Sequence, residues 1–169
     1  TRLLRSASPR RAIRCGDRST SACSDNRGLP SPNDTTSFRC TLRVYWEDTD
    51  AGGVVFYANY LKFFERARTE WLRSLGFGQE RLRTDTGAIF IVADTSVRYL
   101  RPARLDDLLE ISVVPEELGR VSMTLAQQAW RHGPGGAELL AEGRIRIGCV
   151  EAGTFRTRRI PNEILQTLR

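Results

Sequence analysis

The sequence predicts an α+β domain in which an antiparallel sheet wraps around one long helix. Two observations lead to this fold. A single long helical pattern with an aromatic face follows residue 57. Strand-like alternation of apolar and polar residues precedes this helix and fills most of the chain after it. One strand, one long helix and then an antiparallel meander is the order expected of an α+β protein.

The first predicted strand covers residues 38–46, where apolar and polar residues alternate. This alternation indicates a strand with one buried face. We expect Cys40, Leu42, Val44 and Trp46 to lie on that face. An acidic turn with two glycines follows the strand.

The predicted helix runs from about residue 57 to residue 75. Its apolar residues recur three and four positions apart, which is the spacing of an amphipathic helix. They are Tyr60, Leu61, Phe64, Ala67, Trp71, Leu72 and Leu75. Gly76 is well placed to end the helix in the left-handed conformation. So large an aromatic face needs a broad partner surface, and a sheet wrapped around the helix would supply it.

The second half of the chain is predicted to be mainly strands. Residues 77–87 are expected to form a loop with one helical turn. The period of two then indicates strands at residues 89–99, 108–114, 121–130 and 139–149. A short strand at 154–160 and a C-terminal helical turn at 162–168 complete the prediction.

The chain has 169 residues, 40% of them hydrophobic and 27% charged, as expected of one globular domain. It has no apolar run near the ~20 residues that span a bilayer, so no transmembrane helix is expected. Residues 1–37 hold seven Arg and three Asp, which is +4 of the net charge of +6. This segment lacks aromatic residues, and we predict a disordered tail at 1–37 and one folded domain at 38–169. Because the excess charge lies in this tail, nucleic-acid binding is not predicted for the domain.

The tail leaves two interpretations open. Its Arg and Ser content is typical of a transit peptide, although its three Asp residues are not. Alternatively, the sequence is a fragment, or the tail is translated sequence upstream of the true start, because the chain begins with Thr1 and its single methionine is Met123.

The candidate chemistry lies in the turn between the first strand and the long helix. Glu47, Asp48 and Asp50 precede Gly52 and Gly53. Paired glycines allow the backbone to approach a ligand closely. The start of the next helix offers N–H groups that can polarise a carbonyl, and a carboxylate facing them could activate water. This is a minimal hydrolase site. The alternative is that the acids form a solvated turn and cap the helix.

Other catalytic and metal sites are disfavoured by composition. His132 is the single histidine and lies in a predicted hairpin tip, which argues against Ser-His-Asp and Cys-His hydrolases. With no CxxC pair and one histidine, the usual zinc spacings are absent, so we predict no metal and no cofactor. Cys40 and Cys149 are interpreted as small buried residues of a reducing compartment, which favours a cytoplasmic protein.

Four stretches of the chain resemble a known family. They are Asp-Thr-Asp-Ala-Gly-Gly-Val-Val at 48–55, Phe-Glu-Arg-Ala-Arg-Thr-Glu at 64–70, Val-Arg-Tyr-Leu-Arg-Pro-Ala-Arg-Leu-Asp-Asp at 97–107 and Ala-Glu-Gly-Arg-Ile-Arg at 141–146. The chain from residue 38 onward resembles the 4-hydroxybenzoyl-CoA thioesterase family. It is most similar to the small acyl-CoA thioesterases associated with the bacterial Tol–Pal cluster. The resemblance implies the hotdog fold, a sheet wrapped around one long central helix.

The resemblance also implies an activity, the hydrolysis of an acyl-CoA to free acid and CoA. It assigns the catalytic carboxylate to Asp50, as a nucleophile or as a general base, and the oxyanion donor to the backbone N–H of Tyr57. The most similar relatives commonly have histidine at the position of Tyr57. Substrate contacts are expected at Gly53, Val54 and Asn59. Arginine suits phosphate, so Arg98 and Arg101 are candidates for binding CoA.

The expected partners are the acyl-CoA substrate, acyl carrier protein as a further candidate, and other copies of the chain. An antiparallel sheet without obvious edge protection invites pairing, and the resemblance implies dimers or tetramers with active sites shared between subunits. An alternative function is a non-hydrolytic hotdog module that binds acyl thioesters or acyl carrier protein.

Overall fold

The computed structural model of the protein describes residues 37–168. The predicted disorder of residues 1–37 falls outside this range, apart from Ser37. The elements in chain order are β1 (Phe38–Arg43), the 3-10 turn η1 (Trp46–Asp48), α1 (Asn59–Ser74), α2 (Gln79–Thr86), β2 (Ala88–Tyr99), β3 (Leu108–Leu118), β4 (Ser122–Gly133), β5 (Gly136–Glu151) and α3 (Asn162–Thr167).

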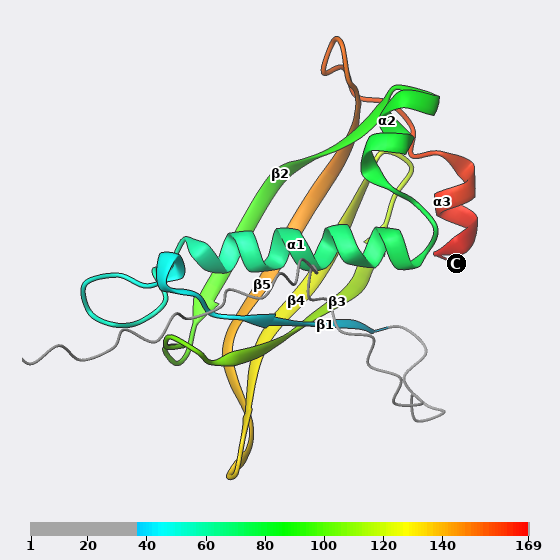
Figure 1. Cartoon of the computed structure of the whole chain (residues 1–169). Helices are drawn as coiled ribbons and strands as arrows, with labels where there is room; N and C mark the ends of the chain where they lie inside the picture. The colour runs from blue at the N-terminus through cyan, green and yellow to red at the C-terminus, as the bar shows by residue number, and fades with distance from the viewer. Residues whose placement is uncertain (1–36, 169) are drawn as a thin grey trace, which may run out of the picture.

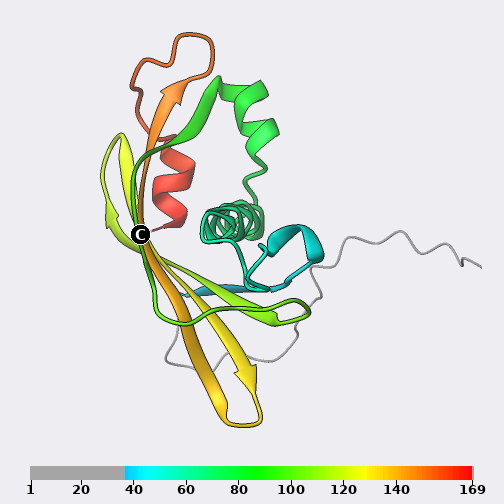
Figure 2. The same ribbon diagram turned by 90° about the vertical axis from the view of Figure 1, so that its left-hand side faces the viewer.

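The five strands form one antiparallel sheet in the order β1-β3-β4-β5-β2. The sheet curves around α1, which crosses its concave face (Figure 1). Seen along the helix, α1 lies inside the curve of the sheet, with α2 and α3 toward one end (Figure 2). The α+β fold with a sheet around one long helix is therefore confirmed. This arrangement leaves β1 and β2 at the two edges of the sheet.

The core lies between α1 and the concave face of the sheet. Phe63, Phe64 and Ala67 of α1 are fully buried, as are Ile111 of β3 and Leu125 of β4. These side chains remove a large apolar area from water, the main stabilising contribution in a domain of this size. No helix among residues 37–168 combines the length and the apolar character needed to cross a bilayer.

The first strand is shorter than predicted. It ends at Arg43, and the chain turns at η1, where the Asp48 N–H donates to the Tyr45 carbonyl over 3.0 Å. The Tyr45 N–H in turn donates to Asp48 Oδ2 over 2.9 Å. These bonds end the extended conformation, so Trp46 does not lie on the buried face and is 78% exposed. The prediction for Trp46 was wrong, whereas Val44 is fully buried as expected.

The region after α1 is more helical than predicted. The end of α1 is as expected, because Gly76 has φ +91°. Residues 79–86, predicted as part of a loop, form α2, which ends at Gly87 with φ +72°. Only Leu82 of α2 is buried, so this helix has almost no apolar pattern from which it could be predicted.

Two further boundaries differ from the prediction. Strand β3 continues past residue 114 to Leu118 through an irregularity between Pro115 and Glu117. The predicted strand at 154–160 is absent from the described residues, where a single bridge joins Val150 to Thr157. Phe155 has φ +55°, a conformation incompatible with a continuous strand.

Candidate active site

A tight turn presents Asp50 at the end of the molecule where α1 begins. The Asp50 N–H donates to the Val54 carbonyl over 2.9 Å, and the Gly53 N–H donates to the Asp50 carbonyl over 3.0 Å. Gly53 has φ +72°, a conformation that side-chain-bearing residues seldom adopt. Gly53 and Val54 thus form the return limb of the turn that carries Asp50.

The carboxylate of Asp50 is held at one oxygen only. Its Oδ1 accepts the Gly52 N–H over 2.8 Å, and Oδ2 has no hydrogen-bond partner among residues 37–168. The residue is exposed. A carboxylate oriented in this way can accept a proton from water or attack an electrophilic carbon.

Asp48 holds the turn in place from beneath. It is only 2% exposed. Besides the bond from Tyr45, its carbonyl accepts the Phe56 N–H and the side-chain amide of Asn59, each over 2.9 Å. These contacts make Asp48 a buried anchor that orients the turn. Asn59, expected to contact substrate, is buried and uses its Nδ2 in this contact.

Tyr57 lies two residues before Asn59, the first residue of α1. Neither its N–H nor that of Ala58 donates to any acceptor among the described residues. Helix α1 also has no side-chain cap at Ala58. Unpaired N–H groups at a helix start are suited to stabilising an oxyanion. Tyr57 is 62% exposed.

Tyr99 connects the end of β2 to this helix start. Its hydroxyl donates to the Tyr57 carbonyl over 3.0 Å. Its ring meets those of Tyr57 and Tyr60 edge-on, at 6.3 and 5.5 Å between centroids. Sequence reasoning placed Tyr99 in a strand and gave it no functional role. The hydroxyl contact crosses 42 positions of sequence, which no local pattern reveals.

The loop between β2 and β3 lies against the Asp50 turn. The Val55 N–H donates to the Ala103 carbonyl over 2.8 Å, and the Ala103 N–H donates to the Tyr60 hydroxyl over 3.2 Å. Burial raises the pKa of the Tyr60 phenol, and the Ala103 hydrogen bond partly offsets this rise. The turn, the helix start and this loop therefore form one connected unit.

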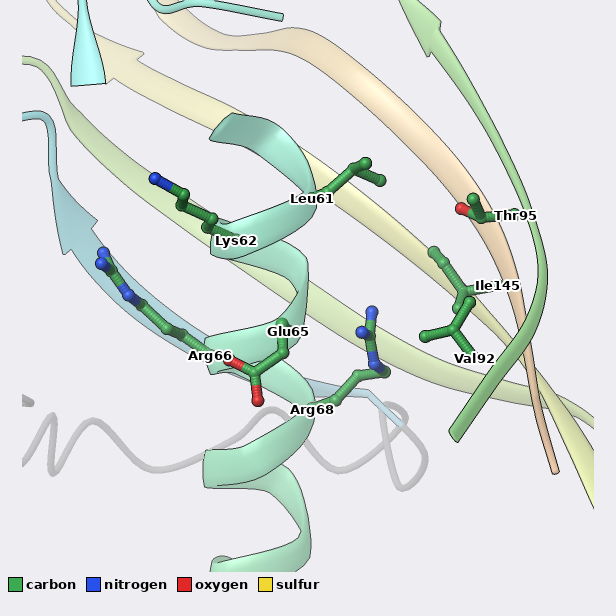
Figure 3. A pocket seen from close by; sticks show the side chains of 8 residues that line it. All are labelled: Leu61, Lys62, Glu65, Arg66, Arg68, Val92, Thr95 and Ile145. Carbon is green, nitrogen blue, oxygen red and sulfur yellow. The ribbon is translucent and has the colours of Figure 1, made fainter. Parts of the chain in front are cut away.

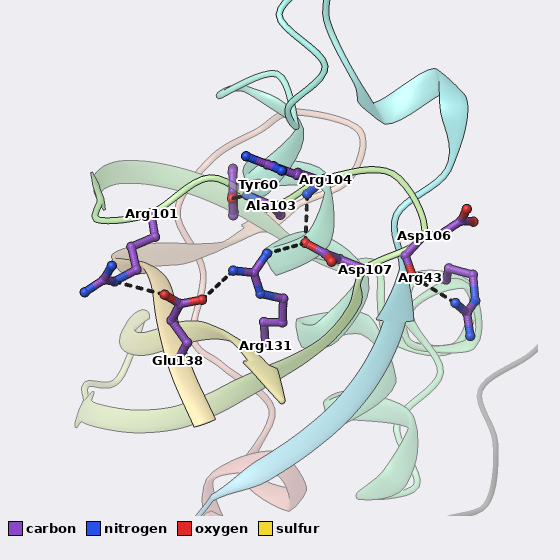
Figure 4. Close-up of polar contacts among 9 residues, drawn as sticks. All are labelled: Arg43, Tyr60, Arg101, Ala103, Arg104, Asp106, Asp107, Arg131 and Glu138. Atoms are coloured by element: carbon purple, nitrogen blue, oxygen red, sulfur yellow. Dashed lines mark hydrogen bonds and ion pairs between the residues drawn. The ribbon is translucent and has the colours of Figure 1, made fainter. Parts of the chain in front are cut away.

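The two arginines predicted to bind CoA lie on β2 and on the β2–β3 loop. Arg98 forms an ion pair with Glu142 at 2.7 Å, and Arg101 pairs with Glu138 at 3.2 Å. Both guanidinium groups are largely exposed. Arg101 begins a chain of charges that runs through Glu138 and Arg131 to Asp107 (Figure 4). The hydrogen bonds that Arg131 donates to the carboxylates of Asp107 and Glu138 raise the pKa of Arg131.

A pocket of about 550 Å³ lies between α1 and β2 (Figure 3). Its lining residues are Leu61, Lys62, Glu65, Arg66, Arg68, Val92, Thr95 and Ile145. Leu61, Glu65 and Arg68 are three or four residues apart and so share one face of α1. The pocket therefore begins in the first turn of α1, four residues after Tyr57. Sequence reasoning identified the helix but not this pocket, because β2 lies beside α1 only in the folded chain.

Comparisons with known proteins identify the family. A profile of the thioesterase superfamily matches residues 52–138. An acyl-CoA thioester hydrolase, YbgC, from Escherichia coli is 42% identical over 133 residues, which are 78% of this chain and 95% of that protein. The chain belongs to the thioesterase superfamily. The predicted family is confirmed.

Solved structures of similar proteins agree with this thioesterase fold. A probable thioesterase from Bartonella henselae is 32% identical, with a TM-score of 0.69 over 74% of this chain and 99% of that one. The 4-hydroxybenzoyl-CoA thioesterase of a Pseudomonas strain has a TM-score of 0.73 over 78% of this chain and 99% of that one. At 20% identity, the latter shows the fold alone. The hotdog prediction is confirmed.

The superfamily profile covers the helix start, Arg98, Arg101 and every lining residue of the pocket except Ile145, but begins two residues after Asp50. The role of Asp50 therefore depends on the geometry of the turn and on the resemblance of residues 48–55. No group of His, Cys, Asp or Glu side chains within residues 37–168 is arranged to hold a metal ion. His132, at the end of β4, is exposed and lies 3.4 Å from Glu110.

Proposed function

We propose that this protein hydrolyses the thioester bond of an acyl-CoA, releasing the free acid and CoA. The observation that carries the proposal is that two suitable groups occur at the end of the molecule where α1 begins. The exposed carboxylate of Asp50 accepts a hydrogen bond at Oδ1 alone, and the N–H groups of Tyr57 and Ala58 have no acceptor among the described residues. Support also comes from relatives at 42% and 38% identity that are named as acyl-CoA thioester hydrolase and acyl-CoA thioesterase.

The chemistry proposed for this site needs two groups. The thioester carbonyl binds at the Tyr57 N–H, which stabilises the negative charge that develops on oxygen. Asp50 then acts in one of two ways. As a general base, it takes a proton from water, the water oxygen attacks the acyl carbon, and the C–S bond breaks. As a nucleophile, it attacks the acyl carbon itself to give a mixed anhydride, which water then hydrolyses. CoA leaves as the thiolate in both routes and is protonated.

The turn and the helix start also supply the proposed substrate contacts. Gly53 and Val54 form the return limb of the turn that carries Asp50, and their backbone is the proposed contact for the thioester. Asn59 is proposed to act by holding this geometry through Asp48. Relatives commonly have histidine at position 57. The side chain of Tyr57 is proposed only to shape the entrance to the site, because the backbone N–H donor does not depend on the side chain.

Arg98 and Arg101 are proposed to bind the phosphates of CoA. Their ion pairs with Glu142 and Glu138 are exposed, and exposed pairs contribute about 0–1 kcal/mol. A phosphate, with more charge and more acceptor oxygens than a carboxylate, can therefore displace these partners.

A homodimer is proposed to form through β2. This strand is at an edge of the sheet, and Ile91 and Val92 on it are exposed, Val92 by 51%. Exposed edge strands with apolar side chains favour pairing with another chain. Light scattering tests the assembly, and a tetramer would indicate a second interface. A cytoplasmic location remains a prediction from the cysteines. An association with the Tol–Pal cluster and acyl carrier protein as a partner remain predictions from the resemblance.

A panel of acyl-CoAs tests the function directly. Short aliphatic, long aliphatic and aromatic acyl-CoAs are incubated with the full chain, and the free thiol of CoA is measured over time. Turnover of at least one class is expected. Tight binding of acyl-CoA without release of thiol across the panel would instead support the non-hydrolytic module.

A further inference from the structure

The peptide group between Ala103 and Arg104 is held from both sides. Its carbonyl oxygen accepts the Val55 N–H over 2.8 Å, and its N–H, which is that of Arg104, donates to Asp107 Oδ2 over 2.8 Å. Ala103 is fully buried. The carboxylate of Asp107 therefore fixes the peptide group to which the residue directly after the Asp50 turn is bound.

Ala103 also binds the helix start. Its N–H donates to the Tyr60 hydroxyl over 3.2 Å. Val55 lies two residues before Tyr57, and Tyr60 lies three residues after it. The proposed oxyanion donor, the Tyr57 N–H, thus belongs to a short segment whose two ends are bound to the same residue. A displacement of Ala103 would move both ends of this segment.

The middle of the β2–β3 loop depends on Asp107 for its place. The loop leaves β2 through the N–H groups of Leu100 and Arg101, which both donate to the Leu140 carbonyl. Apart from the contacts with Val55 and Tyr60, the hydrogen bonds of residues 102–105 within the described part of the chain all go to Asp107.

Arg131 of β4 in turn fixes Asp107. Its Nη1 donates to the same Oδ2 over 2.8 Å, and its Nη2 binds Glu138 of β5. Figure 4 shows the guanidinium group between these two carboxylates, and Asp107 between Arg131 and the backbone of Arg104. A planar guanidinium group held by two carboxylates has a restricted orientation. The side chains of Arg131 and Asp107 are 31% and 20% exposed, and ion pairs near the surface contribute little to stability.

We infer that Asp107 is a positioning residue for the proposed hydrolysis, with Arg131 as its support. Through the Ala103–Arg104 peptide group, Asp107 holds the Tyr57 N–H and the end of the Asp50 turn in the geometry that the transition state needs. The inference rests on the proposed function and adds to it a residue that touches neither the substrate nor the reacting atoms. Because the oxyanion forms only during the reaction, the effect falls on kcat rather than on KM.

The test measures kcat and KM of Asp107→Ala for the acyl-CoA that the wild type hydrolyses fastest, well below the lowest Tm of the variants. Alanine leaves the Arg104 N–H without its acceptor. Removal of an oxyanion donor typically costs about 10²–10³ in kcat, so a displaced donor is expected to lower kcat by about 10- to 100-fold with little change in KM. A purely structural role predicts a lower Tm with kcat of the folded enzyme unchanged.

Two further variants grade the effect. Asp107→Asn keeps an oxygen that can accept the Arg104 N–H, and it is expected to retain most of kcat. Arg131→Met leaves the Asp107 carboxylate in place without its support and is expected to lower kcat by about 2- to 10-fold. The matched control is Arg144→Met, because Arg144 of β5 also binds two carboxylates, those of Glu116 and Glu117. Its kcat is expected to equal that of the wild type.

A double variant with Tyr99→Phe shows whether Asp107 acts on the oxyanion donor. The Tyr99 hydroxyl holds the Tyr57 carbonyl, so both residues restrain the same short segment. The loss of kcat in the double variant is expected to be smaller than the product of the two single losses, because a donor displaced by one change has less to lose by the other. A loss equal to the product means that the two residues act on different groups, and the inference is wrong.

The outcomes separate this inference from the proposed function. Folded Asp107→Ala with wild-type kcat, or an equal loss of kcat in Arg144→Met, overturns the inference and leaves hydrolysis intact. If Asp107→Ala fails to fold, Arg131→Met decides the question, and a wild-type kcat in that variant overturns the inference. Failure of the wild-type enzyme to hydrolyse any acyl-CoA refutes the proposed function itself.

Discussion

Replacing Gly143 with alanine should destabilise the protein, because the added Cβ would crowd two buried side chains. Gly143 lies on β5 opposite Gln127, beneath the aromatic face of α1. A Cβ at this position would lie 2.9 Å from Phe64 Cε2, 3.4 Å from Phe64 Cδ2 and 3.2 Å from Ile145 Cδ1. Phe64 is fully buried, so its ring cannot swing into solvent to relieve the contact.

The size of the effect follows from two opposing contributions. Overpacking a core typically costs about 1–3 kcal/mol. Alanine in a strand interior is more favourable than glycine by about 0.5–1 kcal/mol. The net loss of unfolding free energy is therefore about 0.5–2 kcal/mol, or about 1–8 °C in Tm for a domain of this size.

Thermal unfolding followed by circular dichroism measures this loss. The matched control is Gly148→Ala on the same strand, where nothing lies within 4 Å of the added Cβ. Its Tm should equal or slightly exceed that of the wild type. Equal Tm values for Gly143→Ala and the wild type, or the same loss in both variants, would mean that α1 does not pack on β5 as described.

Three further predictions concern the helix start, alkaline pH and assembly. Tyr99→Phe removes the hydroxyl bond to the Tyr57 carbonyl and should lower kcat about 2- to 10-fold with little change in Tm; an unchanged kcat would mean that this bond does not position the oxyanion donor. Burial raises the pKa of Tyr60 above its value in the unfolded chain. Above pH ~10 the folded state therefore binds more protons than the unfolded state, and the unfolding free energy should fall as pH rises through the folded pKa. Tyr60→Phe should flatten this fall, and an identical pH profile would refute the assignment. Val92→Arg places a charge on the exposed edge of β2 and should convert the dimer to monomer in light scattering, whereas a persistent dimer would exclude this edge as the interface.

The parts of the fold that were predictable are those in which burial imposes a period on the sequence. The aromatic stripe of α1 follows the helical spacing because one face packs on the sheet. The alternation in β1 appears because one face of that strand is buried. Helix α2 has no such stripe, since Leu82 alone is buried. Its ends are set by Gly87 and local hydrogen bonds, so periodicity could not reveal it.

The parts of the candidate site that were not predictable depend on contacts between distant segments. Asp50 and the glycine turn are adjacent in sequence and could be recognised together. The Tyr99 hydroxyl and the pocket between α1 and β2 exist only after β2 has taken its place at the sheet edge. Arg68 carries a weak sequence signal. It falls on the buried side of an amphipathic helix, next to Ala67, where a charged residue is uncommon.

Turnover by Asp50→Asn is the most direct test of the proposed hydrolysis. Asparagine is nearly isosteric and keeps the side-chain oxygen that accepts the Gly52 N–H, while it removes the group that activates water or attacks carbon. We expect the rate of CoA release from a good substrate to fall by at least about 100-fold, with Tm close to that of the wild type. Asp48→Asn, in the buried anchor of the same turn, should reduce the rate much less. Near wild-type turnover by Asp50→Asn would contradict the assignment, and unfolding of this variant would favour a purely structural role for the turn.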